Sequence, residues 1–399
     1  MRNSRRWRPA AALLAVALLA TACSGDDDDA GGDEGSQSAV PSGESPYTTD
    51  LSDVCPDPFV VQKDWLAEVE HAAFYQLIGP GGEMSENQYR GPLGDTGIDL
   101  QIIDGGPGLG QGQNAIQTLT AGNLRFNVTA DMAFVSSDDL AIYSAAYPAV
   151  GVVAPLDRSP QMLFWDPERY QDGFENVDQL IALNNTDGAR IYVRSIDDSF
   201  GRYLVEQGVP AELFVEGYQG DGENFVANDG AWLNQGYSSN EVWDFENGRE
   251  WERPVDYVYV SELGYDFYPS VPSVAADRLE ELGPCLERLV PLIQQAQVDY
   301  IQDPAMVNQL LTDYNDGDYG AGFWKTPLEL NEAGAQIMAE DDLVGNGNNA
   351  TLGDFEMERV QTTIDNIADS LDDRANPEVA PEDIVTNAFI DESIGISSE

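Results

Sequence analysis

The chain has 399 residues and a formal net charge of −52, from 71 acidic and 19 basic side chains. This balance excludes nucleic acid as a partner, because binding to phosphates needs a basic footprint. The acidic residues are spread along the whole sequence, which indicates a halophilic type of protein that works where salt screens the repulsion between like charges.

The N-terminus predicts export and a lipid anchor. Four arginines precede an apolar run over 10–20 that is too short to span a bilayer. The run ends in Leu-Ala-Thr-Ala-Cys, which resembles a bacterial lipobox with Cys23 as the lipidated residue. We therefore expect a lipoprotein signal peptide over 1–22, with an ordinary cleaved signal as the alternative. Residues 23–55 are rich in Asp, Gly and Ser, which predicts a disordered acidic linker.

The next hundred residues alternate strand and helix patterns. The expected elements are a strand over 59–61, a helix over 71–78, a strand over 98–103, a Gly-rich loop over 105–112, a helix over 113–121, a strand over 131–135, a helix over 138–146 and a strand over 150–155. This alternation predicts a mostly parallel sheet with helices on both faces.

A second series of strands and helices follows. It comprises a helix over 176–183, strands over 189–194, 211–217 and 255–263, helices over 197–207 and 228–234, and then helices over 274–282, 284–301, 303–313, 327–339 and 354–371. The acidic, Pro-containing end after Asn376 is expected to pack loosely. We predict two α/β lobes, one from 56–155 with 262–399 and the other from 156–261. The two crossings between them would form a hinge, with the ligand in the interlobe cleft.

Two cysteines remain in the exported part of the chain, Cys55 and Cys285. In an exported protein two such cysteines most simply form one disulfide bond. It would connect the start of the folded region to a helix far along the sequence. Two buried free thiols are the alternative.

Most catalytic and cofactor chemistries lack their residues in this sequence. The segment Gly110-Gln-Gly-Gln-Asn-Ala115 fits a dinucleotide fingerprint, but no convincing acidic residue follows at the required spacing, and an exported protein has no ready supply of NAD. A loop whose amides face a small ligand and a purely structural turn remain open. There is no nucleophile elbow and no close His or Cys cluster, so we expect no metal, no cofactor and no enzymatic activity.

The only histidine, His71, lies among aromatic residues just after a predicted strand. His71 and Tyr75 are four apart and share a helix face, and Trp65 precedes them. Ligands of α/β folds bind at the ends of the strands, so these residues could form the aromatic wall of a binding site, with His71 as the polar contact. A structural role for His71 is the alternative. Asn240 and Glu241 lie in another aromatic and amide-rich segment, where the Glu241 carboxylate could accept from an amino group or cation.

These segments together resemble the NMT1/THI5-like group of solute-binding proteins of ABC importers, over about 58–300. The similar segments are Asp64-Trp65 followed by His71-Ala-Ala-Phe-Tyr75, Gly97-Ile-Asp-Leu, Leu119-Thr-Ala-Gly122 and Ser238-Ser-Asn240-Glu241. The resemblance implies an α/β fold of the periplasmic-binding-protein type II, whose lobes close around the solute. It implies ligand contacts from Asp64, Trp65, His71 and Tyr75 in one lobe and from Ser195, Asn240 and Glu241 in the other.

The function implied by the resemblance is that of a lipid-anchored extracytoplasmic receptor, a monomer that delivers its solute to a permease and an ATPase. The expected solute is aromatic or heterocyclic, with a thiamine-type pyrimidine first. Riboflavin, an aromatic acid, nitrate, a sulfonate or taurine are alternatives. A surface enzyme on the same fold and a sensory or adhesive lipoprotein are the alternatives from other functional classes.

Overall fold

The computed structural model describes residues 45–106, 113–220, 222–317, 319–368 and 371–397. By contacts between residues the chain divides into two units, Met1–Ser42 and Gly43–Glu399, and every described residue belongs to the second. The predicted signal peptide and Cys23 lie outside the described residues. Within the described part, no helix combines the length and the apolar character needed to cross a membrane.

The first sheet has seven strands in the order β2-β3-β4-β1-β5-β12-β6. Their bounds are β1 Phe59–Gln62, β2 Glu83–Ser85, β3 Gln88–Pro92, β4 Asp99–Ile103, β5 Met132–Val135, β6 Ala149–Gly151 and β12 Val271–Ala275. β1 pairs in parallel with β4 and β5, and β12 lies antiparallel between β5 and β6. All four residues of β1 are buried, as expected for a central strand covered on both faces.

The second sheet has five strands in the order β11-β7-β10-β8-β9. Their bounds are β7 Gln161–Trp165, β8 Arg190–Val193, β9 Phe214–Glu216, β10 Trp232–Tyr237 and β11 Asp256–Tyr259. β8 pairs in parallel with β9 and β10, and β7 lies antiparallel between β10 and β11. Both sheets therefore share one strand order. In each sheet, the parallel strand that comes first in the sequence lies between the second and the third, and an antiparallel strand pairs with the third.

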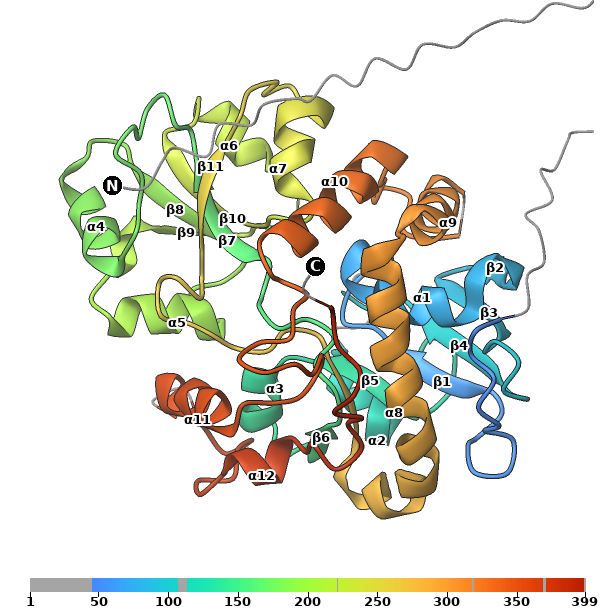
Figure 1. The fold of residues 1–399 in the computed structure, drawn as a ribbon. Helices are drawn as coiled ribbons and strands as arrows, with labels where there is room; N and C mark the ends of the chain where they lie inside the picture. The colour runs from blue at the N-terminus through green and yellow to red at the C-terminus, as the bar shows by residue number, and fades with distance from the viewer. Residues whose placement is uncertain (1–44, 107–112, 221, 318, 369–370, 398–399) are drawn as a thin grey trace, which may run out of the picture. The chain divides into compact units, whose positions relative to one another are not determined.

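Helices cover the faces of both sheets (Figure 1). The α-helices are α1 Ala72–Ile78, α2 Thr118–Ala121, α3 Ser137–Ile142, α4 Val177–Ala182, α5 Ser199–Glu206, α6 Glu223–Ala227, α7 Glu241–Trp243, α8 Leu279–Gln302, α9 Ala305–Asp316, α10 Leu328–Glu340, α11 Met357–Asn366 and α12 Pro381–Ile384. The short 3-10 helices are η1 Val69–His71, η2 Gly79–Gly81, η4 Ala115–Gln117, η5 Leu183–Asn185, η6 Ala211–Leu213 and η8 Ala276–Arg278, and η7 Asp244–Gly248 is a π-helix. The long helix α8 packs along α1.

Three expectations about these elements are wrong. The helix expected over 274–282 begins only after β12, because Val271–Ala275 is completely buried between two strands, where a short apolar run forms a strand. The helix expected over 228–234 does not form: 228–230 is a turn after α6, and 232–234 begin β10, whose pairing with β7 and β8 overrides local propensity. The C-terminal end does not pack loosely, since Ile384 and Val385 are each 1% exposed and Val385 bridges to Gly151.

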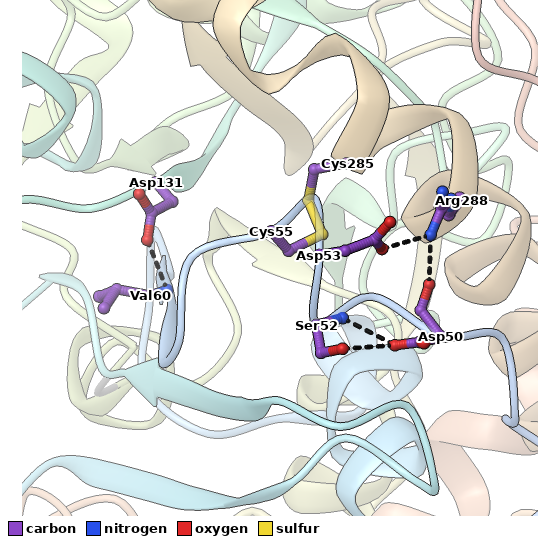
Figure 2. The surroundings of a disulfide bond; sticks show 8 residues. All are labelled: Asp50, Ser52, Asp53, Cys55, Val60, Asp131, Cys285 and Arg288. Atoms are coloured by element: carbon purple, nitrogen blue, oxygen red, sulfur yellow. Dashed lines mark hydrogen bonds and ion pairs between the residues drawn. A yellow bond between two sulfur atoms is a disulfide. The ribbon is translucent and has the colours of Figure 1, made fainter.

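The disulfide bond between Cys55 and Cys285 is present, which confirms the pairing over free thiols (Figure 2). It attaches the segment before β1 to helix α8, across a sequence separation of 230 residues. One turn further along α8, Arg288 Nη1 donates to Asp53 Oδ1 at 2.7 Å and to the Asp50 carbonyl oxygen at 2.8 Å. These contacts hold the start of the folded region against the helix that covers the first sheet.

Candidate ligand-binding site

A cavity of about 550 Å³ is lined by residues from both sheets and their connections. The first-sheet side contributes the segment after β1 and the start of α3, and the second-sheet side contributes the segment after β9 and the end of β10. The carboxyl ends of parallel strands in an open α/β sheet are where ligands bind. The volume falls within the range of sites for small organic ligands.

Aromatic side chains form much of the cavity wall. They are Trp65, Phe134, Tyr143, Phe200, Tyr218, Tyr237, Tyr265, Phe267 and Trp324. Trp65 and Trp324 meet edge to face, with ring centroids 6.0 Å apart. Trp324 is held in place because its Nε1 donates to the Ala67 carbonyl oxygen at 3.1 Å. A Cβ at Gly106, where φ is +51°, would lie 2.4 Å from the Trp65 ring, so glycine is needed there for close packing.

A buried ion pair positions the segment that carries Asp64 and Trp65. Lys63 is completely buried, and its Nζ lies 2.8 Å from Asp104 Oδ1. The same Nζ donates to the Tyr75 hydroxyl at 2.7 Å. Because an unpaired charge would be costly at such a site, this pair strongly favours one geometry for the end of β1. Tyr75 is 0% exposed and does not line the cavity, so it supports the wall from behind.

His71 also lies behind the wall. Its ring is completely buried, packs edge to face on Phe134 at a centroid distance of 4.9 Å, and is not part of the cavity lining. Its Nε2 donates to Asp64 Oδ1 at 2.7 Å, and Ser270 Oγ donates to Asp64 Oδ2 at 2.6 Å. Burial raises the pKa of Asp64, but the contacts with His71 and Ser270 and a backbone hydrogen bond together outweigh burial and hold that pKa below its usual value. His71 therefore orients an ionised Asp64 in the wall.

Glu241 is the carboxylate of the second-sheet side. It begins α7, is 3% exposed and lines the cavity. The Tyr218 hydroxyl donates to its Oε1, and the Tyr237 backbone N–H donates to Oε2 at 2.8 Å. Burial raises the pKa of Glu241 to about 7, although both hydrogen bonds oppose that shift. Asn240, directly before it, lines the cavity as well.

A second carboxylate, Glu68, lies on the first-sheet side of the cavity. Its Oε1 is 3.8 Å from His71 Nδ1, beyond hydrogen-bond distance. Burial raises the pKa of Glu68 well above its usual value, and the charges of Glu70 and Asp64 add to the effect. Glu70 itself accepts a hydrogen bond from Ser239 Oγ, which directly links the segment after β1 to the segment after β10.

The start of α3 and the segment after β8 line another part of the cavity. Asp138 Oδ2 accepts from the Tyr265 hydroxyl at 2.6 Å. Burial raises the pKa of its neighbour Asp139 to about 7, with the charge of Asp138 as the next cause. Arg194 lines the cavity, and its Nε donates to Asp198 Oδ2 at 2.7 Å. Ser195 is not part of the lining, because its hydroxyl donates to Glu216 Oε1 at 2.9 Å.

The structure thus brings together four of the seven residues predicted to bind ligand, Asp64, Trp65, Asn240 and Glu241. Sequence reasoning missed Trp324, which lies between α9 and α10, and Tyr218, which follows β9. Neither has a local sequence signal, since each is an isolated aromatic residue in a connecting segment. It also missed Glu68, although this acidic residue lies between Trp65 and His71 in the segment already singled out.

Comparisons with known proteins bear on the fold. The sequence matches no protein-family model and no curated protein. Among solved structures, the ligand-binding component of an ABC-type import system from Staphylococcus aureus is 12% identical with a TM-score of 0.51, over 86% of this chain and 100% of that one. A protein from Methylobacillus flagellatus, described as the periplasmic sulfonate-binding protein of an ABC transporter, is 10% identical with a TM-score of 0.51, over 84% and 93% of the two chains.

The chain has the periplasmic-binding-protein fold. The two mixed sheets with one shared strand order are the features that carry this assignment, and the fold class predicted from the sequence is confirmed. At this level of identity the similarity establishes the fold alone. The bounds of the two predicted lobes remain a prediction, although the strands of the second sheet all lie between 161 and 259.

Proposed function

We propose that this chain is the extracytoplasmic solute-binding receptor of an ABC importer, anchored through lipid on Cys23 and delivering its solute to a permease and an ATPase. The observation that carries the proposal is the aromatic cavity between the two sheets of a binding-protein fold. The lipobox-like N-terminus supports export and anchoring, and the structural neighbours described as import components support the partner class.

The proposed solute is a small aromatic or heterocyclic compound that packs against Trp65 and is bound by Asp64, Asn240 and Glu241. A thiamine-type pyrimidine fits this combination, because its ring can stack and its amino group can donate to carboxylates. His71 and Tyr75, which the family resemblance suggested as contacts, act in this proposal by positioning the wall. Closure of lobe 156–261 on lobe 56–155 with 262–399 would bury the solute.

Binding is favoured over catalysis by the arrangement of the only histidine. A serine nucleophile needs a base within hydrogen-bond reach. His71 Nε2 is occupied by Asp64, and the ring lies outside the cavity lining, so no described serine of the cavity hydrogen-bonds a histidine. A surface enzyme on this fold therefore has less support than a receptor.

A thermal-shift screen in molar salt tests the proposal, with a thiamine-type pyrimidine, riboflavin, benzoate, taurine and nitrate as probes. A ligand at a hundredfold excess over its Kd adds about 2.7 kcal/mol to the free energy of unfolding. We expect an aromatic compound to produce such a shift, and Trp65→Ala to weaken its affinity at least tenfold. Phe323→Ala is the matched control, because Phe323 is 64% exposed and does not line the cavity. Binding that is equally strong in both variants would exclude this cavity as the site.

A further inference from the structure

The described lining of the cavity is strongly unbalanced in charge. It contains seven carboxylates, which are Asp64, Glu68, Asp138, Asp139, Asp197, Asp198 and Glu241, against the two guanidinium groups of Arg194 and Arg374. Both arginines already have acidic partners, since Arg194 pairs with Asp198 at 2.7 Å and Arg374 pairs with Asp372 at 2.8 Å. Both cationic side chains of the described wall are therefore already paired with a carboxylate, which makes the wall a poor site for an anionic solute.

Among the partly buried carboxylates of the lining, Glu68 and Asp139 accept no hydrogen bond from any other described residue. Burial raises the pKa of both, to about 7 for Asp139 and well above the usual value for Glu68. A hydrogen-bond donor that arrives with the ligand would offset the cost of burying either carboxylate. Within the described chain, no three His, Cys, Asp or Glu side chains are grouped so as to hold a metal ion.

A second and independent feature is a pair of buried amides from the second sheet. Gln161 and Gln235 are each 7% exposed, and both line the cavity. Gln161 is opposite Tyr237 in the antiparallel pair of β7 and β10, and Gln235 lies two residues before Tyr237 on the same strand face. Gln235 Oε1 accepts from the Arg194 backbone N–H at 3.2 Å, which leaves its Nε2 without a described partner.

The Gln161 side-chain amide makes no hydrogen bond to another described residue. Buried side-chain amides normally make hydrogen bonds within the protein. An amide in a cavity wall that makes none is therefore available to bind a ligand. Neutral amides can both donate and accept, so they suit the edge of a nitrogen heterocycle. The two glutamines thus point to an organic ligand with polar atoms on a flat ring, not to a simple ion.

We propose that the solute is an organic cation, a flat nitrogen compound whose positive charge lies against Glu68 and whose ring packs between Trp65 and the Gln161–Gln235 face. This assignment rests on the proposed receptor function and narrows its substrate class. A cation beside a carboxylate gains a charge-assisted hydrogen bond, and a cation over an indole face gains a further attraction. The same charges favour such a cation over sulfonate and nitrate as the solute.

Three probes of nearly the same shape test the sign of the charge. Benzamidine is a cation, benzamide is its neutral analogue, and benzoate is the anion. We expect titration calorimetry at pH 8 and constant molar salt to show benzamidine binding at least tenfold more tightly than benzamide, with benzoate weaker than both.

Two variants test whether Glu68 is responsible for the preference for benzamidine. Glu68→Gln should weaken benzamidine binding at least tenfold and change benzamide binding less than twofold, because only the cation loses its partner. The substitution replaces a partly buried carboxyl group that accepts no hydrogen bond from a described residue, so the variant is expected to fold. Glu212→Gln is the control, since Glu212 is exposed on η6 and does not line the cavity.

Two outcomes overturn the inference. One is equal or tighter binding of benzamide or benzoate, and the other is benzamidine binding that Glu68→Gln leaves unchanged. A neutral heterocycle from the thermal-shift screen that binds in a Trp65-dependent manner, with no binding of benzamidine, would support the receptor function and refute the proposal of a cationic solute. If neither the screen nor the three probes give Trp65-dependent binding, both fall.

Discussion

The raised pKa of Glu241 predicts a measurable pH dependence of stability. Burial moves this pKa from 4.5 to about 7 in the folded protein. Between these values the folded chain holds a proton that the unfolded chain has released, so the free energy of unfolding falls as pH rises through this window. A shift of this size corresponds to about 3 kcal/mol, and the loss is complete above pH 7. Glu241→Gln removes the titration and therefore this loss.

The measurement is urea unfolding of the wild type and Glu241→Gln at pH 4 to 8 in constant salt, with ΔG taken from the midpoint and slope. At pH 4 the two chains should differ only by a fixed offset, because the amide nitrogen of Gln cannot accept a hydrogen bond, whereas the two oxygens of Glu241 accept from the Tyr218 hydroxyl and the Tyr237 N–H. Relative to that offset, the variant should gain up to about 3 kcal/mol by pH 8. Glu212→Gln, at an exposed position on η6, is the control variant. A difference for Glu241→Gln that does not change with pH would refute the reasoning.

Three further predictions concern the framework of the site. Replacing both Cys55 and Cys285 by Ser should lower the free energy of unfolding by about 5 kcal/mol in the chain-entropy treatment, because the bond closes a loop of 230 residues, and an unchanged urea midpoint would contradict this. Lys63→Met should cost about 3 to 5 kcal/mol in the same assay, since it leaves the buried Asp104 carboxylate without its cation. His71→Ala should weaken ligand affinity less than Trp65→Ala does in titration calorimetry, and the reverse order would contradict this ranking.

Much of the fold was predictable because local patterns were consistent with it. The strand over 59–61, the helix that follows it and the helices after 303 were found from runs of apolar residues and helical spacing. The cysteine pair was predictable from the exported context. No strand was predicted at β2, β3 or β7. Strands β10 and β12 overlap segments expected to be helical, because a short buried strand and a buried helix segment have the same apolar composition. Their pairing with distant strands decided their structure.

The sequence by itself determined the compartment prediction, the exclusion of nucleic acid, the α/β class and the segment after β1 as part of the site. Tertiary structure decided the role of each residue within that segment. Asp64 and Trp65 face the cavity, whereas His71 and Tyr75, a few residues later, are completely buried behind it. Only the fold could bring Gln161 and Trp324 to the same cavity, because both depend on packing between chain segments more than 150 residues apart. Local spacing sets which side chains share a helix face, but long-range packing sets which of them meets the ligand.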